Sequence, residues 1–250
     1  MWWSQEDVEE QKKRLEREIA KRVKRGESFE ALPAPEGQKK LCKTFWGQAW
    51  CRNLESYQQY ESRLPRGRSY LRQGKVYNLE ITPGRLSAVV AGAELYDASV
   101  SIAPLSDHEW QEIVLSSAGQ VPSMLDLLSG KLGDGLIKVL TDPQDGLFPK
   151  SKEIRFDCTC PDYADLCEHV SAILYGVGVM LDRQPELLFT LRGVDRAELL
   201  SEASSRTLDD LDPGNELDAV DLSALFGIDL GEQVLKAEEK APDSKFPTMK

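Results

Sequence analysis

Residues 156–169 decide the fold, and they read Phe156-Asp157-Cys158-Thr159-Cys160-Pro161-Asp162-Tyr163-Ala164-Asp165-Leu166-Cys167-Glu168-His169. Three of the chain's five cysteines and one of its two histidines fall within this stretch. A structural zinc ion takes four thiolate or imidazole ligands in a tetrahedron. We therefore predict a zinc site with one complete shell of ligands: Cys158, Cys160, Cys167 and His169.

The residues around these four predict a strand, a turn and a helix. Glu153–Phe156 predicts a strand that leads into the first cysteine. Pro161 and Asp162 favour a turn, because proline fixes φ and aspartate accepts hydrogen bonds from the backbone that follows it. The apolar run Val170–Leu181 predicts a helix whose first turn returns the second pair of ligands to the bend.

Other interpretations of the four residues stay open. A disulfide would suit an exported protein, but we find no secretory signal in the sequence, which favours reduced thiols. Three unconnected buried thiols with a surface histidine are a further alternative. A catalytic zinc is less favoured, because four protein ligands leave no open position for water. We expect no enzyme, since the sequence also offers no phosphate-binding glycine loop and no catalytic triad.

The spacing Cys-x-Cys, six residues, Cys-x-His, followed by an apolar helix, resembles the SWIM zinc finger. Further segments resemble the bacterial SWIM zinc finger proteins: Thr44–Trp50, Arg63–Tyr70 with the following Gly74-Lys75-Val76, and Leu188–Gly193. The resemblance covers residues 40–200. It implies a DNA-binding or protein-interaction module, and a Swi/Snf-type helicase-like ATPase as partner.

Composition limits the class of protein. A hydrophobic content of 41% supports a globular body. The formal net charge of −11 argues against an unconditional nucleic-acid binder, because such binding rests on neutralised phosphates. The longest apolar run, 172–181, is far shorter than the roughly 20 residues that a membrane span needs. We therefore expect a cytoplasmic protein without membrane contact.

The remaining pattern predicts an α+β fold, with a small antiparallel sheet, flanking helices and the zinc finger. Alternating apolar residues over 76–105 predict three strands, with a turn at Pro83-Gly84-Arg85. We expect four segments: a basic helical extension and linker (1–36), an α+β scaffold (37–150), the finger with its closing helices (151–205), and an acidic, partly disordered tail (206–250).

Two stretches ahead of the sheet are predicted to be helical. Glu6–Arg25 is basic with a thin apolar stripe, so it is either a solvated helix or one that binds phosphates or a partner. In Lys43–Leu64 the aromatic residues have a helical spacing that favours a core-facing stripe. Cys42, Cys51 and His108 lack neighbours at ligand spacing, so we expect two ordinary thiols and a surface histidine.

Between these helices and the sheet lies a basic stretch, Arg63–Lys75, with a tyrosine and two glycines. On a flexible loop such residues can grip phosphates and stack a base. Equally, they can pair with acidic residues of the same chain or of a partner. The candidate nucleic-acid contacts are Arg63, Arg66, Arg68, Tyr70, Arg72 and Lys75.

Acidic residues dominate from residue 209 onward, and 217–230 among them has the apolar pattern of an amphipathic peptide. This segment either docks in a partner's groove, through Leu222, Leu225, Phe226 and Ile228, or packs on its own domain. The sequence thus predicts a zinc-binding adaptor that is accessory to the ATPase. The alternative is a direct nucleic-acid-binding protein that uses its basic amino-terminal half and is regulated by the acidic tail.

Overall fold

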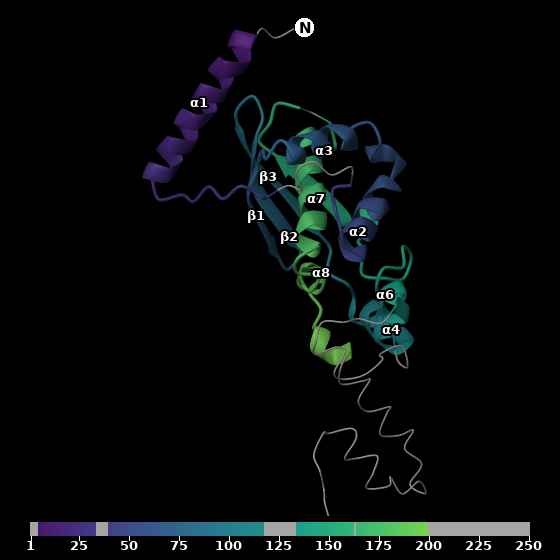
Figure 1. The fold of residues 1–250 in the computed structure, drawn as a ribbon. Helices are drawn as coiled ribbons and strands as arrows, with labels where there is room; N and C mark the ends of the chain where they lie inside the picture. Colours follow the sequence, from purple (N-terminus) through teal and green to yellow (C-terminus); the bar gives the residue numbers. More distant parts are fainter. Residues whose placement is uncertain (1–4, 34–39, 118–133, 163, 200–250) are drawn as a thin grey trace, which may run out of the picture. The chain divides into compact units, whose positions relative to one another are not determined.

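The structure is a computed structural model that describes residues 5–33, 40–117, 134–162 and 164–199 (Figure 1). The chain divides into two units, Met1–Arg206 and Thr207–Lys250, and every described residue belongs to the first. The predicted docking segment at 217–230 lies outside the described residues.

Four strands form one antiparallel sheet in the order β1-β2-β3-β4. They are β1 (Val76–Thr82), β2 (Arg85–Ala91), β3 (Leu95–Ile102) and β4 (Ile154–Cys158). The turn between β1 and β2 requires Gly84, whose φ of 69° lies in the left-handed region. The predicted α+β class is confirmed, and so is the first hairpin. Because Cys158 pairs with Ala98, the first predicted ligand lies beside the middle of β3.

Helix α7 (Glu168–Leu181) crosses one face of this sheet and contacts all four strands (Figure 1). Twelve of its 14 residues are buried. The sheet and other helices surround α7 on nearly every side, which explains why its sequence is almost continuously apolar. Helix α7 therefore connects the predicted metal ligands at its start to the centre of the core.

Helix α2 (Phe45–Glu55) packs against α7. Thr44 caps its N-terminus, and the Asp182 carboxylate after α7 accepts a 3.0 Å hydrogen bond from the Thr44 N–H. Trp50 is fully buried and donates from its indole nitrogen to the Leu174 carbonyl at 2.7 Å. The prediction of a core-facing aromatic stripe is confirmed, although the helix ends at residue 55 and does not continue to residue 64.

The basic stretch forms helix α3 (Leu64–Arg72), so the expectation of a flexible loop was wrong. Pro65 lies in the first turn, where its missing N–H leaves no helical hydrogen bond unmade. The glycine that suggested a loop has a packing role. A Cβ on Gly67 would lie 2.3 Å from the Cβ of Ser171 in α7. Gly67 therefore allows the two helices to approach closely.

The described chain contains further helices: α1 (Gln5–Lys24), α4 (Asp107–Ser117), α6 (Asp134–Leu140), α8 (Leu187–Arg192), and the 3-10 turns η1 (Gln58–Tyr60) and η2 (Ser151–Glu153). In α4 the side chain of His108 is 80% exposed, as predicted. Across the described residues, every helix is too short or too polar to cross a bilayer.

Arg192, at the end of α8, is 1% exposed and forms a buried ion pair. Its guanidinium donates to the Glu153 carboxylate at 3.0 Å and to the Ala103 carbonyl at 2.7 Å. A buried pair of this kind is costly to break, because the remaining charge loses its partner. The pair fastens α8 to the residues that lead into β4.

We expect Gly67→Ala to destabilise the protein, because its new Cβ would overlap Ser171. Overpacking costs about 1–3 kcal/mol, and it must exceed the roughly 1 kcal/mol that alanine gains over glycine in a helix. Urea unfolding followed by circular dichroism measures the difference. Ser69→Ala, on the exposed side of α3, is the matched control and should change stability by less than about 0.5 kcal/mol. A more stable Gly67→Ala protein would contradict the tight crossing of α3 and α7.

Candidate metal centre

The structure brings the four predicted ligands together where β4 ends and α7 begins. Cys158 is the last residue of β4, Cys160 follows in the bend, Cys167 is the N-cap of α7, and His169 lies in its first turn. Their ligand atoms all lie within 4.8 Å of one another. His169 and Cys167 are buried, and the other two cysteines are half-buried. The sequence prediction of the cluster is therefore confirmed as an arrangement that could bind a metal ion.

The distances and the donor atoms fit a tetrahedral ion. With metal–sulfur bonds of about 2.3 Å, the edge of such a tetrahedron is about 3.8 Å. The longest separation in the cluster is 4.8 Å, and Cys158 Sγ lies 4.0 Å from His169 Nδ1. Side-chain rotations that shorten the longest of these separations by about 1 Å would bring the four ligand atoms to the spacing of a tetrahedral site.

The packing around His169 selects which ring nitrogen faces the thiols. Nε2 is buried, and a Cβ on Gly92 would lie 2.4 Å from it. Tyr96 and Tyr70 pack on the ring, with centroid distances of 4.5 and 5.3 Å. Nε2 has no hydrogen-bond partner among the described residues, so ring packing and the contact of Nδ1 with the Cys158 sulfur orient the ring. Nδ1 therefore faces the thiols, and Gly92 provides the space for the imidazole.

Cys167 has a second role as the N-cap of α7. Its sulfur accepts a hydrogen bond from the Val170 N–H at 3.5 Å. A helix N-terminus stabilises negative charge, because its first N–H groups point outward. Hydrogen bonds from Cys158, His169 and the Val170 N–H lower the pKa of Cys167 to about 4. Cys167 is therefore a thiolate at neutral pH, ready to bind a cation.

The other two thiols keep their protons at neutral pH. The hydrogen bond to Cys167, followed by burial, raises the pKa of Cys158 well above its usual value. Burial also raises the pKa of Cys160. Of the three thiols, Cys167 therefore favours the thiolate most strongly.

Ion pairs connect the start of α3 to the bend between β4 and α7. Arg63 contacts Asp162 at 2.9 Å and Glu168 at 3.7 Å. Asp162 also accepts a hydrogen bond from the Ala164 N–H at 3.1 Å, which is the turn that the sequence predicted. The metal cluster is thus tied to α3 as well as to β4 and α7.

The six candidate nucleic-acid contacts have three kinds of surroundings. Arg63 and Arg68 have acidic partners in the same chain, the latter with Glu55, which agrees with the second interpretation given above. Tyr70 packs on His169, and Lys75 Nζ lies 4.7 Å from the Tyr70 ring centroid. The remaining two residues are exposed on α3: Arg66 and Arg72.

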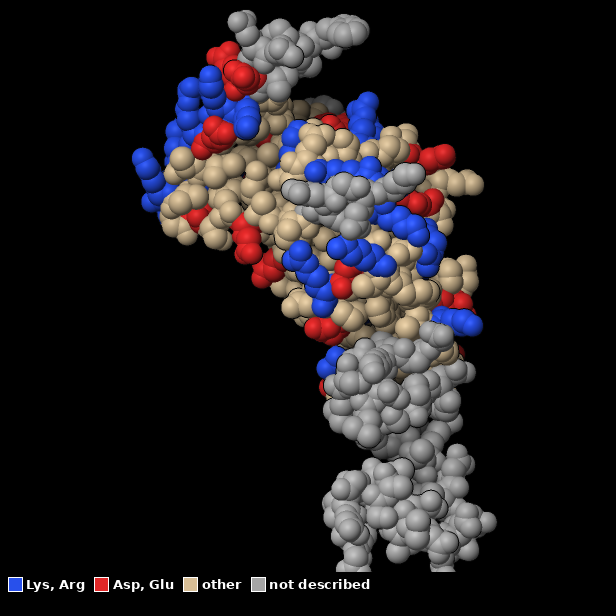
Figure 2. Space-filling view, in the orientation of Figure 1, with Lys and Arg blue, Asp and Glu red and all other residues tan. Residues whose placement is uncertain are grey.

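The distribution of charge shows where a polyanion could approach the described part of the surface. Lysine and arginine side chains gather over α1 and over the middle of the face shown in Figure 2. Helix α1 also donates hydrogen bonds to the turn between β2 and β3, through Gln11 to Gly92 and Arg14 to Ala93. The basic helix is therefore in part attached to this turn, next to the glycine that seats His169.

Sequence reasoning missed one arrangement of thiols. Cys42 and Cys51 were expected to be unrelated, but their sulfurs lie 3.5 Å apart. Their spacing of nine residues matches no ligand or redox motif, so only the packing of the segment before α2 brings them together. The role of Tyr70 against His169 was missed for the same reason.

The comparisons with known proteins are limited in coverage. No protein-family model and no solved structure matches the chain. It is 30% identical over 176 residues to "Uncharacterized protein Rv2102" of Mycobacterium tuberculosis, a match that covers 69% of this chain and 63% of that protein. It is 29% identical over 140 residues to "Endonuclease MutS2" of Clostridium botulinum, covering 53% of this chain and 17% of that protein. The chain thus spans less than two thirds of the length of each relative.

Two substitutions of Cys167 separate its role as a ligand from its role as a cap. Serine and alanine both remove the thiolate, so we expect both variants to lose the bound zinc that the wild type retains after dialysis. Serine can still accept the hydrogen bond from Val170. In chelator, Cys167→Ala should therefore be less stable than Cys167→Ser by about 1 kcal/mol. Atomic absorption and urea unfolding measure the two effects, and a serine variant with full zinc and unchanged melting would refute the site.

Zinc binding should release protons, because Cys158 and Cys160 are protonated in the free cluster while zinc binds thiolates. The raised pKa values mean that protons compete with the ion at neutral pH, so affinity rises with pH. Loss of both protons corresponds to a roughly hundredfold increase in affinity per pH unit. Calorimetry in buffers of different ionisation enthalpy counts the protons. If zinc binding releases no protons, then Cys158 and Cys160 are not protonated in the free cluster.

Proposed function

We propose that the chain is a zinc-binding adaptor with a structural SWIM-type finger, accessory to a Swi/Snf-type helicase-like ATPase. The observation that carries the proposal is the Cys3His cluster between β4 and α7. Four protein ligands leave no coordination position for a substrate or water, which is the arrangement of a structural site. Zinc is the ion favoured by three thiolates and one imidazole at tetrahedral spacing.

The positions of the family-like segments support the resemblance. Thr44–Trp50 caps and forms the first part of α2, Arg63–Tyr70 forms most of α3, and Leu188–Gly193 includes the end of α8. All three helices contact α7, which carries the ligand His169. The residues that resemble the family thus belong to one packed body around the finger.

The free energy of zinc binding supports a structural role for the finger. Zinc binding in finger peptides is worth about 10–16 kcal/mol, which is as large as the stability of a whole domain. The bend between Cys158 and Cys167 contains no helix or strand among its described residues. A bound ion would therefore hold this bend in one conformation, which the hydrogen bonds of a helix or strand do not do here.

Direct nucleic-acid binding is the second candidate. Arg66 and Arg72 are exposed on α3, and the carboxyl-terminal half of α1 is basic. The printed name of one relative, an endonuclease, belongs to an enzyme class that cleaves nucleic acid. The net charge of −11 opposes tight binding, so we rank this function below the adaptor.

Purification of the tagged chain from its own cells after nuclease treatment tests the adaptor. We expect a helicase-like ATPase in stoichiometric amount with the wild type and with Cys51→Ser, which changes a thiol outside the finger. Cys158→Ser should lose the ATPase, since the finger no longer folds. An ATPase that remains bound to Cys158→Ser would show that the finger is not needed, and its absence from all samples would refute the partnership.

The same proteins distinguish the nucleic-acid alternative. If DNA replaces the ATPase in samples without nuclease, binding to a labelled duplex is measured against salt. Each lost phosphate contact should reduce the slope of log affinity against log salt by roughly 0.9. Arg66→Ala should show this reduction, and Arg155→Ala, exposed on β4, is the matched control.

A further inference from the structure

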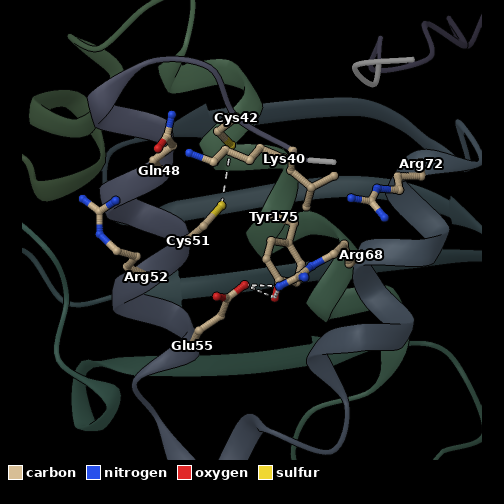
Figure 3. A pocket seen from close by; sticks show the side chains of 10 residues that line it. Lys40, Cys42, Gln48, Cys51, Arg52, Glu55, Arg68, Arg72 and Tyr175 are labelled. Atoms are coloured by element: carbon tan, nitrogen blue, oxygen red, sulfur yellow. Dashed lines mark hydrogen bonds and ion pairs between the residues drawn. The ribbon is translucent and has the colours of Figure 1, made fainter. Parts of the chain in front are cut away.

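A second cluster of thiols lies beside a hollow of about 310 Å³ among α2, α3 and α7. Figure 3 shows Cys42 and Cys51 side by side at this hollow, with Glu55, Arg68 and Tyr175 meeting below them. The Cys42 and Cys51 sulfurs are 3.5 Å apart, and both thiols are free. A disulfide requires a sulfur–sulfur distance of about 2.05 Å, so the two atoms must approach by about 1.5 Å.

The fold holds the two sulfurs against each other. Cys42 lies in the segment before α2, and Cys51 lies within that helix. On one side both face the backbone of α7: a Cβ on Gly178 would lie 3.0 Å from one sulfur and 3.1 Å from the other. Asp182, which accepts hydrogen bonds from Lys43 and Thr44, fixes the segment that carries Cys42. The thiols are therefore neighbours by tertiary packing and do not depend on a flexible loop.

The two thiols differ in access to solvent. Cys42 is 2% exposed, whereas Cys51 is half-buried and lines the hollow. The hydrogen bond with Cys51, together with burial, raises the pKa of Cys42, which favours its protonated form. Cys51 is therefore the sulfur that a small reagent meets first.

We propose that Cys42 and Cys51 form a reversible disulfide, a redox-sensitive site separate from the metal centre, with a peroxide as the oxidant. Cys51 loses its proton, and the resulting thiolate attacks one oxygen of hydrogen peroxide. The O–O bond breaks, the attacked oxygen stays on sulfur as a sulfenic acid, and the other leaves as hydroxide, which takes up the Cys51 proton to form water. The sulfur of Cys42 then attacks the sulfenic sulfur, and the hydroxyl group leaves with the Cys42 proton as a second water. The two thiols together lose two electrons, and one peroxide accepts them and becomes two waters. A small dithiol reverses the reaction by exchange.

The site is independent of the metal centre and of the proposed function. Gly178 lies nine residues after His169 in α7, which corresponds to about 14 Å along the helix axis. Within the described residues the two cysteines belong to no group of three or more metal-ligand side chains. Zinc would occupy the three other cysteines of the chain, leaving Cys42 and Cys51 as its free thiols.

Peptide mapping of the zinc-loaded full chain tests the proposal. The protein is treated with a small excess of hydrogen peroxide, denatured in an alkylating reagent and digested with trypsin without reductant. Cleavage after Lys40, Lys43 and Arg52 should give the peptides 41–43 and 44–52 joined by one disulfide. The intact protein should lose about 2 Da, the mass of two hydrogens, and dithiothreitol should restore it.

Single substitutions supply the controls. Cys51→Ser should abolish the joined peptides and leave Cys42 reduced, because the latter is shielded from solvent. Cys42→Ser should leave Cys51 without its resolving thiol, so that Cys51 accumulates as sulfenic acid that a dimedone probe labels. The proposal is overturned if oxidised wild type shows no joined peptide while Cys51 is oxidised further, if Cys51 joins a finger cysteine, or if both thiols stay reduced under peroxide that oxidises free cysteine.

Discussion

The burial of α7 is the constraint on which the other elements depend. With twelve of 14 residues buried, the helix needs apolar neighbours on nearly every side. The sheet supplies one side, and α2, α3 and α8 supply others. Fully burying a valine, leucine or isoleucine contributes about 1.5–3 kcal/mol. Side chains such as Ile173, Leu174 and Leu181 therefore make α7 a major part of the core.

The start of this buried helix has N–H groups without intrahelical partners, and one of the candidate metal ligands accepts a hydrogen bond from one of them. The first N–H groups of any helix lack intrahelical partners, and leaving them unpaired in the core is costly. Cys167 satisfies one of them with a charged sulfur, which also complements the helix dipole. A buried thiolate in turn needs a counter-charge, and the Cys3His cluster provides the place for a cation. The cap of α7 and the Cys3His cluster thus share one residue, Cys167.

Those parts of the fold that depend on local pattern could be predicted from the sequence. Period-two alternation gave the hairpin of β1 and β2, the apolar run gave α7, and ligand spacing gave the Cys3His cluster. The predictions that failed depend on contacts between distant residues. Gly67 suggested a loop, yet it is a helical glycine required by the close approach of Ser171, more than a hundred residues away. The packing of the Tyr70 ring on His169 was likewise not predicted. No local pattern encodes either contact.

The same limit explains why one set of thiols could be predicted and the other could not. Spacing reveals Cys158, Cys160 and Cys167 because a metal shell restricts how far apart its ligands can lie in sequence. Cys42 and Cys51 meet through the packing of the segment before α2. Gly47 leaves room for this packing, since a Cβ there would fall 2.4 Å from the Gly178 carbonyl oxygen and 2.8 Å from the Cys42 Cβ. A bound cation would hold the finger sulfurs as thiolates and withdraw their lone pairs from other reactions, whereas the Cys51 sulfur faces the hollow with no such shield. The two sets of thiols therefore lie against opposite ends of α7, Cys167 at its N-cap and Cys42 and Cys51 beside Gly178, in two different chemical settings.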